Sequence, residues 1–98
     1  MRILSKSTLK VFWKEHTDAK ASLEFWYKTV TDTDFNNPNE VIALFQNADI
    51  VGNGRIVFNI ARNKYRLIAK FQYKAKFVFV RFIGTHKEYD KIENIENI

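Results

Sequence analysis

The chain has 98 residues, of which 46% are hydrophobic, and its formal net charge at pH 7 is +5. This length and composition predict one folded domain over residues 1–98, because single cores typically use about 100–150 residues, and they argue against a disordered chain. The absence of cysteine excludes a disulfide framework and a thiolate metal site. No stretch approaches the ~20 apolar residues of a membrane span and no signal peptide is recognisable, so we expect a cytoplasmic protein without a membrane partner.

The first half of the chain, residues 1–50, is predicted to be mainly helical. A short strand at Met1–Leu4 precedes two stripes of apolar side chains with the spacing of a helix face, one within Leu9–His16 and one within Ala19–Val30. A third helix is predicted to start at Asn37–Glu40, where a capping Asn is followed by Pro and then by Glu. Both tryptophans lie on these stripes, so we expect them in the core.

The second half, residues 55–91, is predicted to form an antiparallel meander. Three strand-like runs are separated by short polar turns; the runs are Arg55–Ile60, Tyr65–Tyr73 and Phe77–Ile83. Thr85 and Glu88 have the spacing of a capping box, which predicts a short final helix. The expected fold class is therefore α+β, with N-terminal helices packed on one face of a twisted antiparallel sheet and a short C-terminal helix. The other face of the sheet would form a basic concave surface.

Charge is segregated between the two halves. Residues 55–91 carry ten Lys and Arg against only two acidic residues, whereas residues 1–54 carry six against seven. A basic half joined to a nearly neutral half indicates a polyanionic partner, most simply a nucleic acid.

A set of residues in the basic half has the chemistry to cut RNA without a metal ion. His86 titrates near neutral pH and suits proton transfer, and Tyr89, three residues later, shares its side of a helical turn. Arg66 and Arg81 can each give bidentate hydrogen bonds to a phosphate, and the register of the predicted hairpin places them near-diagonal on neighbouring strands. We expect these four side chains to converge on one pocket. The lysines predicted to attract RNA are Lys64, Lys70 and Lys87.

Structural roles can also explain several of these residues. Glu88 suits a helix cap better than a catalytic base, and Asp90 suits the dipole of the same helix. His86 can be a helix-start residue without a role in chemistry. Arginines on strands can extend along a solvated face or pair with acidic residues of the helices.

The order and spacing of three segments resemble the C-terminal signature of HigB-type toxins, in the RelE/ParE-like superfamily of bacterial toxin–antitoxin systems. The segments are Phe58-Asn59-Ile60, Asn63-Lys64-Tyr65-Arg66-Leu67 and Val80 to Asp90. The resemblance implies an mRNA interferase, often acting on the ribosome and neutralised by a cognate antitoxin. Arg62 departs from the pattern, because relatives often have Gly there; it should add a phosphate contact or change the turn.

The leading prediction is a metal-independent endoribonuclease that cleaves mRNA, associated with the ribosome and acting as the toxin of a type II pair. It needs no cofactor, and its other partner is an antitoxin, expected to be a helix-turn-helix protein. The predicted catalytic residues are Arg66, Arg81, His86 and Tyr89, and the predicted RNA-binding residues are Arg62, Lys64, Lys70 and Lys87. The alternatives are a non-catalytic RNA- or ribosome-binding module and an inactive toxin-like protein that binds an antitoxin. The sequence leaves open which residue is the acid and which is the base.

Overall fold

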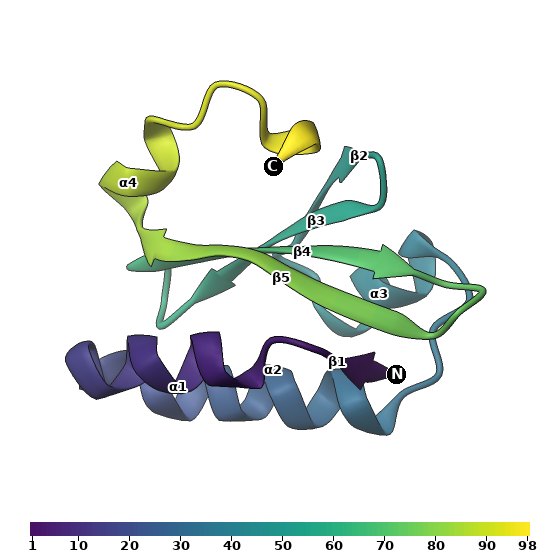
Figure 1. Cartoon of the computed structure of the whole chain (residues 1–98), viewed down its shortest axis with the longest axis horizontal. Coiled ribbons are helices and arrows are strands. Elements are labelled where there is room, and N and C mark those ends of the chain that lie inside the picture. The colour runs from purple at the N-terminus through teal and green to yellow at the C-terminus, as the bar shows by residue number, and fades with distance from the viewer.

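The computed structural model describes all 98 residues, which form four α-helices, five strands and two 3₁₀ turns (Figure 1). In chain order the elements are β1 (Arg2–Ile3), α1 (Lys6–Glu15), η1 (Thr17–Ala19), α2 (Lys20–Asp32), α3 (Pro38–Leu44), β2 (Asp49–Gly52), β3 (Arg55–Ile60), β4 (Tyr65–Gln72), β5 (Phe77–Thr85), α4 (His86–Asp90) and η2 (Ile95–Asn97). None of the helices has the length and apolar character needed to cross a membrane.

The five strands form one sheet in the order β1-β5-β4-β3-β2. Strands β2 to β5 are an antiparallel meander, and β1 joins the far edge in parallel with the first residues of β5. The predicted α+β class, with helices first, a mostly antiparallel sheet and a short last helix, is confirmed. Strand β2 was not predicted, because its four residues carry no alternating pattern of their own and are held by pairing with β3.

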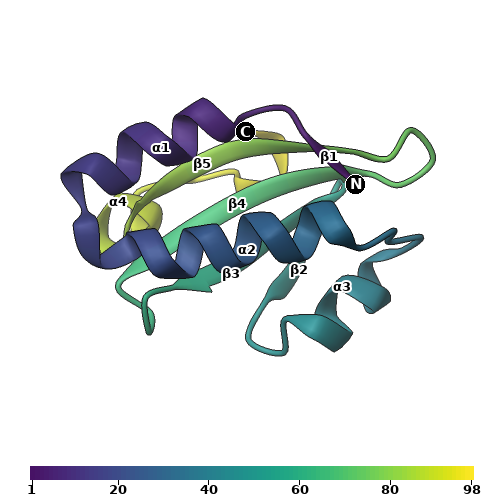
Figure 2. The ribbon, with the colours of Figure 1, turned by 90° about the horizontal axis from the view of Figure 1, so that it is seen from below.

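Helices α1 and α2 cover one face of the sheet, whereas α4 and the chain after it lie on the other (Figures 1 and 2). The core is between the helices and the sheet and contains 16 buried residues. Tyr65, Leu67, Ala69 and Phe71 alternate along β4 and all belong to this core, as their spacing predicted. Both predicted helix stripes face it, and α2 contributes the buried Trp26.

The start of α3 follows the predicted cap. The side-chain oxygen of Asn37 accepts a hydrogen bond from the backbone N–H of Glu40 at 3.1 Å, and Pro38 is the first helical residue. The Glu40 carboxylate in turn accepts from the N–H of Asn36 at 2.9 Å. These bonds satisfy N–H groups that a helix start leaves without partners.

The sheet face opposite the helices is partly covered, which the sequence did not predict. Val57 and Ile68 point away from the helix-side core, yet both are buried. Residues 91–98 pass over this face (Figure 1), and the Asn53 side chain donates a hydrogen bond to the Glu96 main-chain oxygen at 3.1 Å. The expected basic face is therefore crossed by the C-terminal segment.

Candidate nucleic-acid interface and catalytic cluster

Helix α4 begins at the end of β5 because Thr85 and Glu88 form the predicted capping box. The Thr85 hydroxyl accepts from the N–H of Glu88 at 3.2 Å, and the Glu88 carboxylate accepts from the N–H of Thr85 at 2.8 Å. These bonds to Thr85 lower the pKa of Glu88. The carboxylate is thus ionised and engaged in the cap, which confirms the structural interpretation of Glu88 over a role as base.

Three of the four predicted catalytic side chains lie together at this end of the sheet. The Arg66 guanidinium carbon lies 5.7 Å from the centre of the Tyr89 ring, and the His86 and Tyr89 ring centres are 6.4 Å apart at an angle of 76°. Arg66 of β4 pairs with Gly84 of β5, immediately before α4. A Cβ atom at position 84 would lie 2.7 Å from the Phe82 ring, so the absence of a side chain at Gly84 leaves room for that ring.

His86 has a carboxylate partner in Asp90, which was expected only to suit the helix dipole. Its Nδ1 lies 3.0 Å from Oδ2 of Asp90, one helical turn later. A carboxylate can only accept, so this contact places a proton on Nδ1, and in the neutral imidazole Nε2 is the nitrogen that can act as a base. Both side chains are well exposed to solvent, 48% for His86 and 59% for Asp90. The i, i+4 spacing of His86 and Asp90 is the sequence signal from which this pair could have been predicted.

Tyr89 is held in its protonated form. Burial against the sheet raises the pKa of its hydroxyl, and the nearby Arg66 charge only partly opposes that effect. At neutral pH the hydroxyl is therefore a proton donor and not a base.

Arg81 lies apart from the other three. A bulge in β5 separates the pairs Ile68–Phe82 and Ala69–Val80, so Arg81 has no residue opposite it on β4. It is three residues before Gly84, or roughly 10 Å along the strand. Its Nε donates to the main-chain oxygen of Ile98 at 3.1 Å. The structure therefore brings Arg66, His86 and Tyr89 together and directs Arg81 towards the C-terminal segment.

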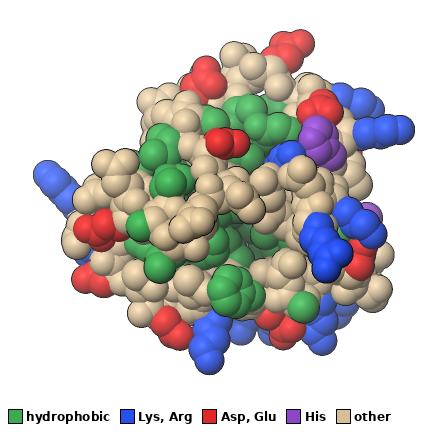
Figure 3. All heavy atoms as spheres, turned by 180° about the vertical axis from the view of Figure 1, so that it is seen from behind, with side chains coloured by type: hydrophobic (Ala, Val, Ile, Leu, Met, Phe, Trp, Pro, Cys, Tyr) green, Lys and Arg blue, Asp and Glu red, His purple; other side chains and the backbone are tan.

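Three of the four predicted RNA-binding residues lie at this end of the sheet, whereas Lys70 lies towards the other end of β4, paired with Arg55 and Phe79. Arg62 is exposed in the hairpin turn and has a left-handed φ of 53°, a backbone conformation that favours glycine. Lys64, in the same turn, pairs with Asp18 of η1 at 3.0 Å. Lys70 is half-buried on the face of β4 that residues 91–98 pass over, and Lys87 is exposed on α4. In the view from behind, Lys and Arg side chains gather near a histidine at one end (Figure 3).

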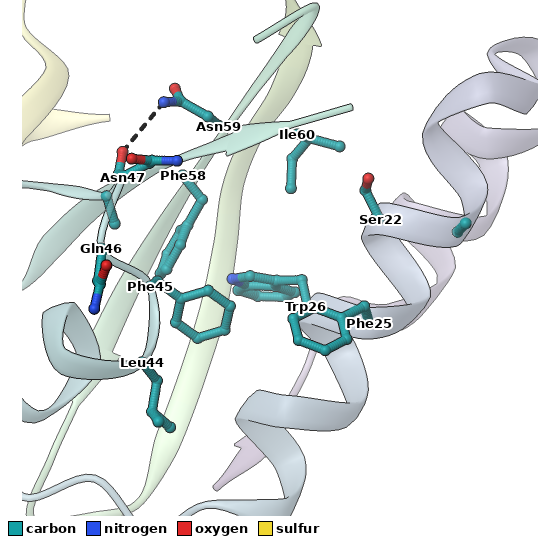
Figure 4. A pocket seen from close by; sticks show the side chains of 12 residues that line it. Ser22, Phe25, Trp26, Leu44, Phe45, Gln46, Asn47, Phe58, Asn59 and Ile60 are labelled. Atoms are coloured by element: carbon teal, nitrogen blue, oxygen red, sulfur yellow. Dashed lines mark hydrogen bonds between the residues drawn. The ribbon is translucent and has the colours of Figure 1, made fainter. Parts of the chain in front are cut away.

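A cavity lined mainly by apolar side chains lies elsewhere, on the helix side of the sheet. It has a volume of about 460 Å³ and lies between α2, β3 and the loop after α3 (Figure 4). Its walls include Phe25, Trp26, Phe45 and Phe58, and no titratable side chain lines it. This cavity therefore offers no group for acid–base chemistry. Nowhere in the chain do three or more His, Asp or Glu side chains gather as a metal site requires.

Comparison with known proteins agrees with the family resemblance. Residues 19–92 match the sequence model of HigB_toxin, described as the RelE-like toxic component of a toxin–antitoxin system. The chain belongs to this family of RelE-like toxins. It is 31% identical over 94 residues to the mRNA interferase HigB of Escherichia coli O6:H1, covering 94% of this chain and 91% of the relative. It is 26% identical over 92 residues to the mRNA interferase toxin HigB of Escherichia coli K12, covering 92% of this chain and 88% of the relative.

Proposed function

We propose that this chain is an mRNA interferase, a metal-independent endoribonuclease that cleaves mRNA on the ribosome as the toxin of a type II toxin–antitoxin pair in the cytoplasm. The observation that carries the proposal is the cluster of Arg66, His86 and Tyr89 at the end of a strongly basic sheet. The cluster combines a base, a proton donor and a guanidinium within reach of one phosphate. Family membership and the names of the relatives support the same activity.

The proposed reaction is an in-line transfer within the RNA. Nε2 of His86 takes the proton of a ribose 2′-hydroxyl, and the 2′-oxygen attacks the adjacent phosphorus. The bond from phosphorus to the 5′-oxygen breaks, and the Tyr89 hydroxyl gives its proton to that leaving oxygen. The products are a 2′,3′-cyclic phosphate and a free 5′-hydroxyl. Asp90 holds the imidazole in the required tautomer through its contact with Nδ1.

Arg66 supplies the electrostatic part of the reaction. Its guanidinium is oriented by the Tyr89 ring and by a hydrogen bond of 3.3 Å to the main-chain oxygen of Asn63. A guanidinium can donate two parallel hydrogen bonds to the phosphate and offset the charge that develops in the transition state. This cation, together with the acid and the base, provides each element that cleavage by the 2′-hydroxyl needs without a metal ion.

The cognate antitoxin is proposed to neutralise the basic surface of residues 55–91. That segment carries ten Lys and Arg against two acidic residues. An antitoxin with acidic or amphipathic segments would complement it and compete with RNA. Co-expression with such a partner should relieve growth arrest.

The cleavage test compares a substitution at the site with a matched one outside it. Tyr89→Phe removes only the proposed acid and should lower the cleavage rate by about 100-fold, because general acids contribute ~10²–10⁴-fold. Tyr27→Phe removes a hydroxyl from the helix layer and should cleave at the wild-type rate. Both variants are assayed on RNA with and without ribosomes, and with a chelator. A wild-type protein that binds RNA without cleaving it in either setting would favour a binding module, and activity abolished by chelator and restored by Mg²⁺ would refute the metal-independent mechanism.

RNA affinity should depend steeply on salt. Arg62 and Lys64 lie in the turn beside the cluster, so replacing both with Ala should weaken binding and flatten the log–log salt dependence by about 0.7 for each phosphate that the variant no longer neutralises. Fluorescence anisotropy with a labelled single-stranded RNA measures this slope. An affinity that does not change with salt would contradict the proposed basic interface.

A further inference from the structure

The turn between β3 and β4 has an unfavourable backbone conformation. Three successive residues, Ala61, Arg62 and Asn63, have left-handed φ values of 52°, 53° and 82°, and none of them is glycine. Residues with a Cβ atom rarely adopt this region, and such a conformation persists only where the surrounding structure holds it. Contacts from outside the turn are therefore needed to fix it in place.

The helix layer supplies these contacts through two side chains. The Ser22 hydroxyl of α2 accepts a hydrogen bond from the N–H of Ala61 at 3.3 Å, at the start of the turn. Asp18 of η1 holds the other end, since its Oδ2 accepts from Lys64 Nζ at 3.0 Å and its Oδ1 accepts from the Tyr65 hydroxyl at 2.6 Å. The bonds from Tyr65 and Lys64 lower the pKa of Asp18, so its carboxylate is ionised at neutral pH and accepts strongly.

The same turn contacts two residues of the catalytic cluster. The main-chain oxygen of Asn63 accepts from Arg66 Nη1 at 3.3 Å, and that of Lys64 accepts from the N–H of His86 at 3.2 Å. His86 is the first residue of α4, so its N–H has no partner within that helix. In Figure 1 the turn, the connection between α1 and α2, and helix α4 all lie at one end of the molecule. A movement of the turn would therefore displace both the guanidinium and the imidazole.

We propose that Asp18 is a positioning residue for RNA cleavage, and that it sets the places of Arg66 and His86 through the turn between β3 and β4. The inference rests on the proposed function, because it takes these two side chains as catalytic. Tyr65 also pairs with Thr85, the N-cap of α4, so its bond to Asp18 fixes the start of the same helix. Misplacing a catalytic group by about 1 Å can lower a rate by ~100-fold, so a contact outside the cluster can be felt in the chemistry.

The kinetic test compares Asp18→Asn with a matched substitution, Asp34→Asn. Asp34 also pairs with a lysine, Lys76 at 2.8 Å, but near the start of β5, at the opposite end of that strand from the cluster. With saturating RNA, at a temperature where every variant is folded, the single-turnover cleavage rate of Asp18→Asn should fall at least about tenfold. Its affinity for RNA should not fall, because the loss of a carboxylate beside Lys64 leaves the surface more positive. Asp34→Asn should cleave at the wild-type rate.

Tyr65→Phe breaks the bond to Asp18 from the other side and keeps the aromatic ring in the core. It should lower the cleavage rate as Asp18→Asn does. In the double variant the loss should be smaller than the product of the two single losses, because both substitutions act on one contact. Losses that multiply would show two separate effects and would overturn the proposed route through Tyr65.

Hydrogen exchange followed by NMR gives a measurement that does not depend on cleavage. The amide proton of His86 should exchange faster in Asp18→Asn and in Tyr65→Phe than in the wild type, because its bond to the Lys64 oxygen is loosened, and Asp34→Asn should not change it. Unchanged exchange in Asp18→Asn, or a wild-type cleavage rate in that variant, would overturn the positioning role and leave the proposed function intact. A wild-type protein that cleaves no RNA would instead refute the proposed function, and the role of Asp18 with it.

Discussion

Replacing His86 with Ala separates the catalytic interpretation of this residue from its structural one. If His86 acts as the base, cleavage should fall by about 100-fold or more, in the range of ~10²–10⁴-fold that general acid–base groups contribute. If it is only a helix-start residue, the cleavage rate should fall no further than the fraction of folded protein does.

The expected structural effect is small and can be worked out from the contacts of His86. The only polar partner of its side chain is Asp90, in an i, i+4 pair whose side chains are 48% and 59% exposed. Such exposed pairs contribute about 0.3–0.5 kcal/mol to stability. With a change of about 4–8 °C in Tm for each kcal/mol in a domain of this size, the variant should melt at most ~4 °C below the wild type.

His16→Ala is the matched control, and it should show the opposite behaviour. The His16 ring stacks on Phe12 with centres 4.3 Å apart and meets the Tyr65 ring edge-on at 5.2 Å. Its removal should lower Tm by more than His86→Ala does, yet leave the cleavage rate per folded molecule unchanged. Cleavage on a labelled RNA and thermal unfolding are measured for both variants. Wild-type cleavage by His86→Ala, at any Tm, would refute its role as base.

Three further substitutions test the remaining contacts of the site and one ion pair. Arg66→Lys keeps the charge but loses the bidentate fork and the stacking on Tyr89, so the single-turnover cleavage rate should fall at least about tenfold. An unchanged rate would refute the proposed binding of the phosphate by Arg66. Asp90→Asn removes the carboxylate that orients the imidazole and should lower the rate constant for cleavage with little effect on RNA affinity; equal losses in both would argue for a binding role. Hydrogen bonds from the Tyr65 hydroxyl and the Lys64 ammonium group lower the pKa of Asp18. The Asp18 carboxylate therefore stabilises the folded state at pH values above its unfolded pKa near 3.8, and this stabilisation is lost as the pH falls through its folded pKa. Asp18→Asn should therefore lower Tm at pH 7, with a difference from wild type that shrinks at pH 3; a difference independent of pH would contradict this account.

The features that could be predicted from the sequence are those with local causes. The start of α3 at Asn37–Glu40 and the capping box of α4 depend on side chains within three residues of each other. The bounds of β3, Arg55–Ile60, agree with the predicted strand because polar turns enclose a short apolar run. The core face of β4 followed from alternation alone.

The features that could not be predicted depend on contacts between distant segments. The bulge that displaces Arg81 adds one residue to β5 without interrupting its apolar pattern, so no local signal marks it. The docking of residues 91–98 on the far face joins Ile98 to Arg55, which is 43 positions earlier. The contact of Arg55 with this segment was consequently not predicted.

Mapping of mRNA 5′ ends after induced expression tests the central claim most directly. The account predicts new 5′ ends within coding regions and growth arrest when the wild-type chain is expressed. Neither should occur with His86→Ala expressed to the same level, and a co-expressed antitoxin should suppress both. Intact mRNA in cells that tolerate high levels of the folded wild-type protein would contradict the account.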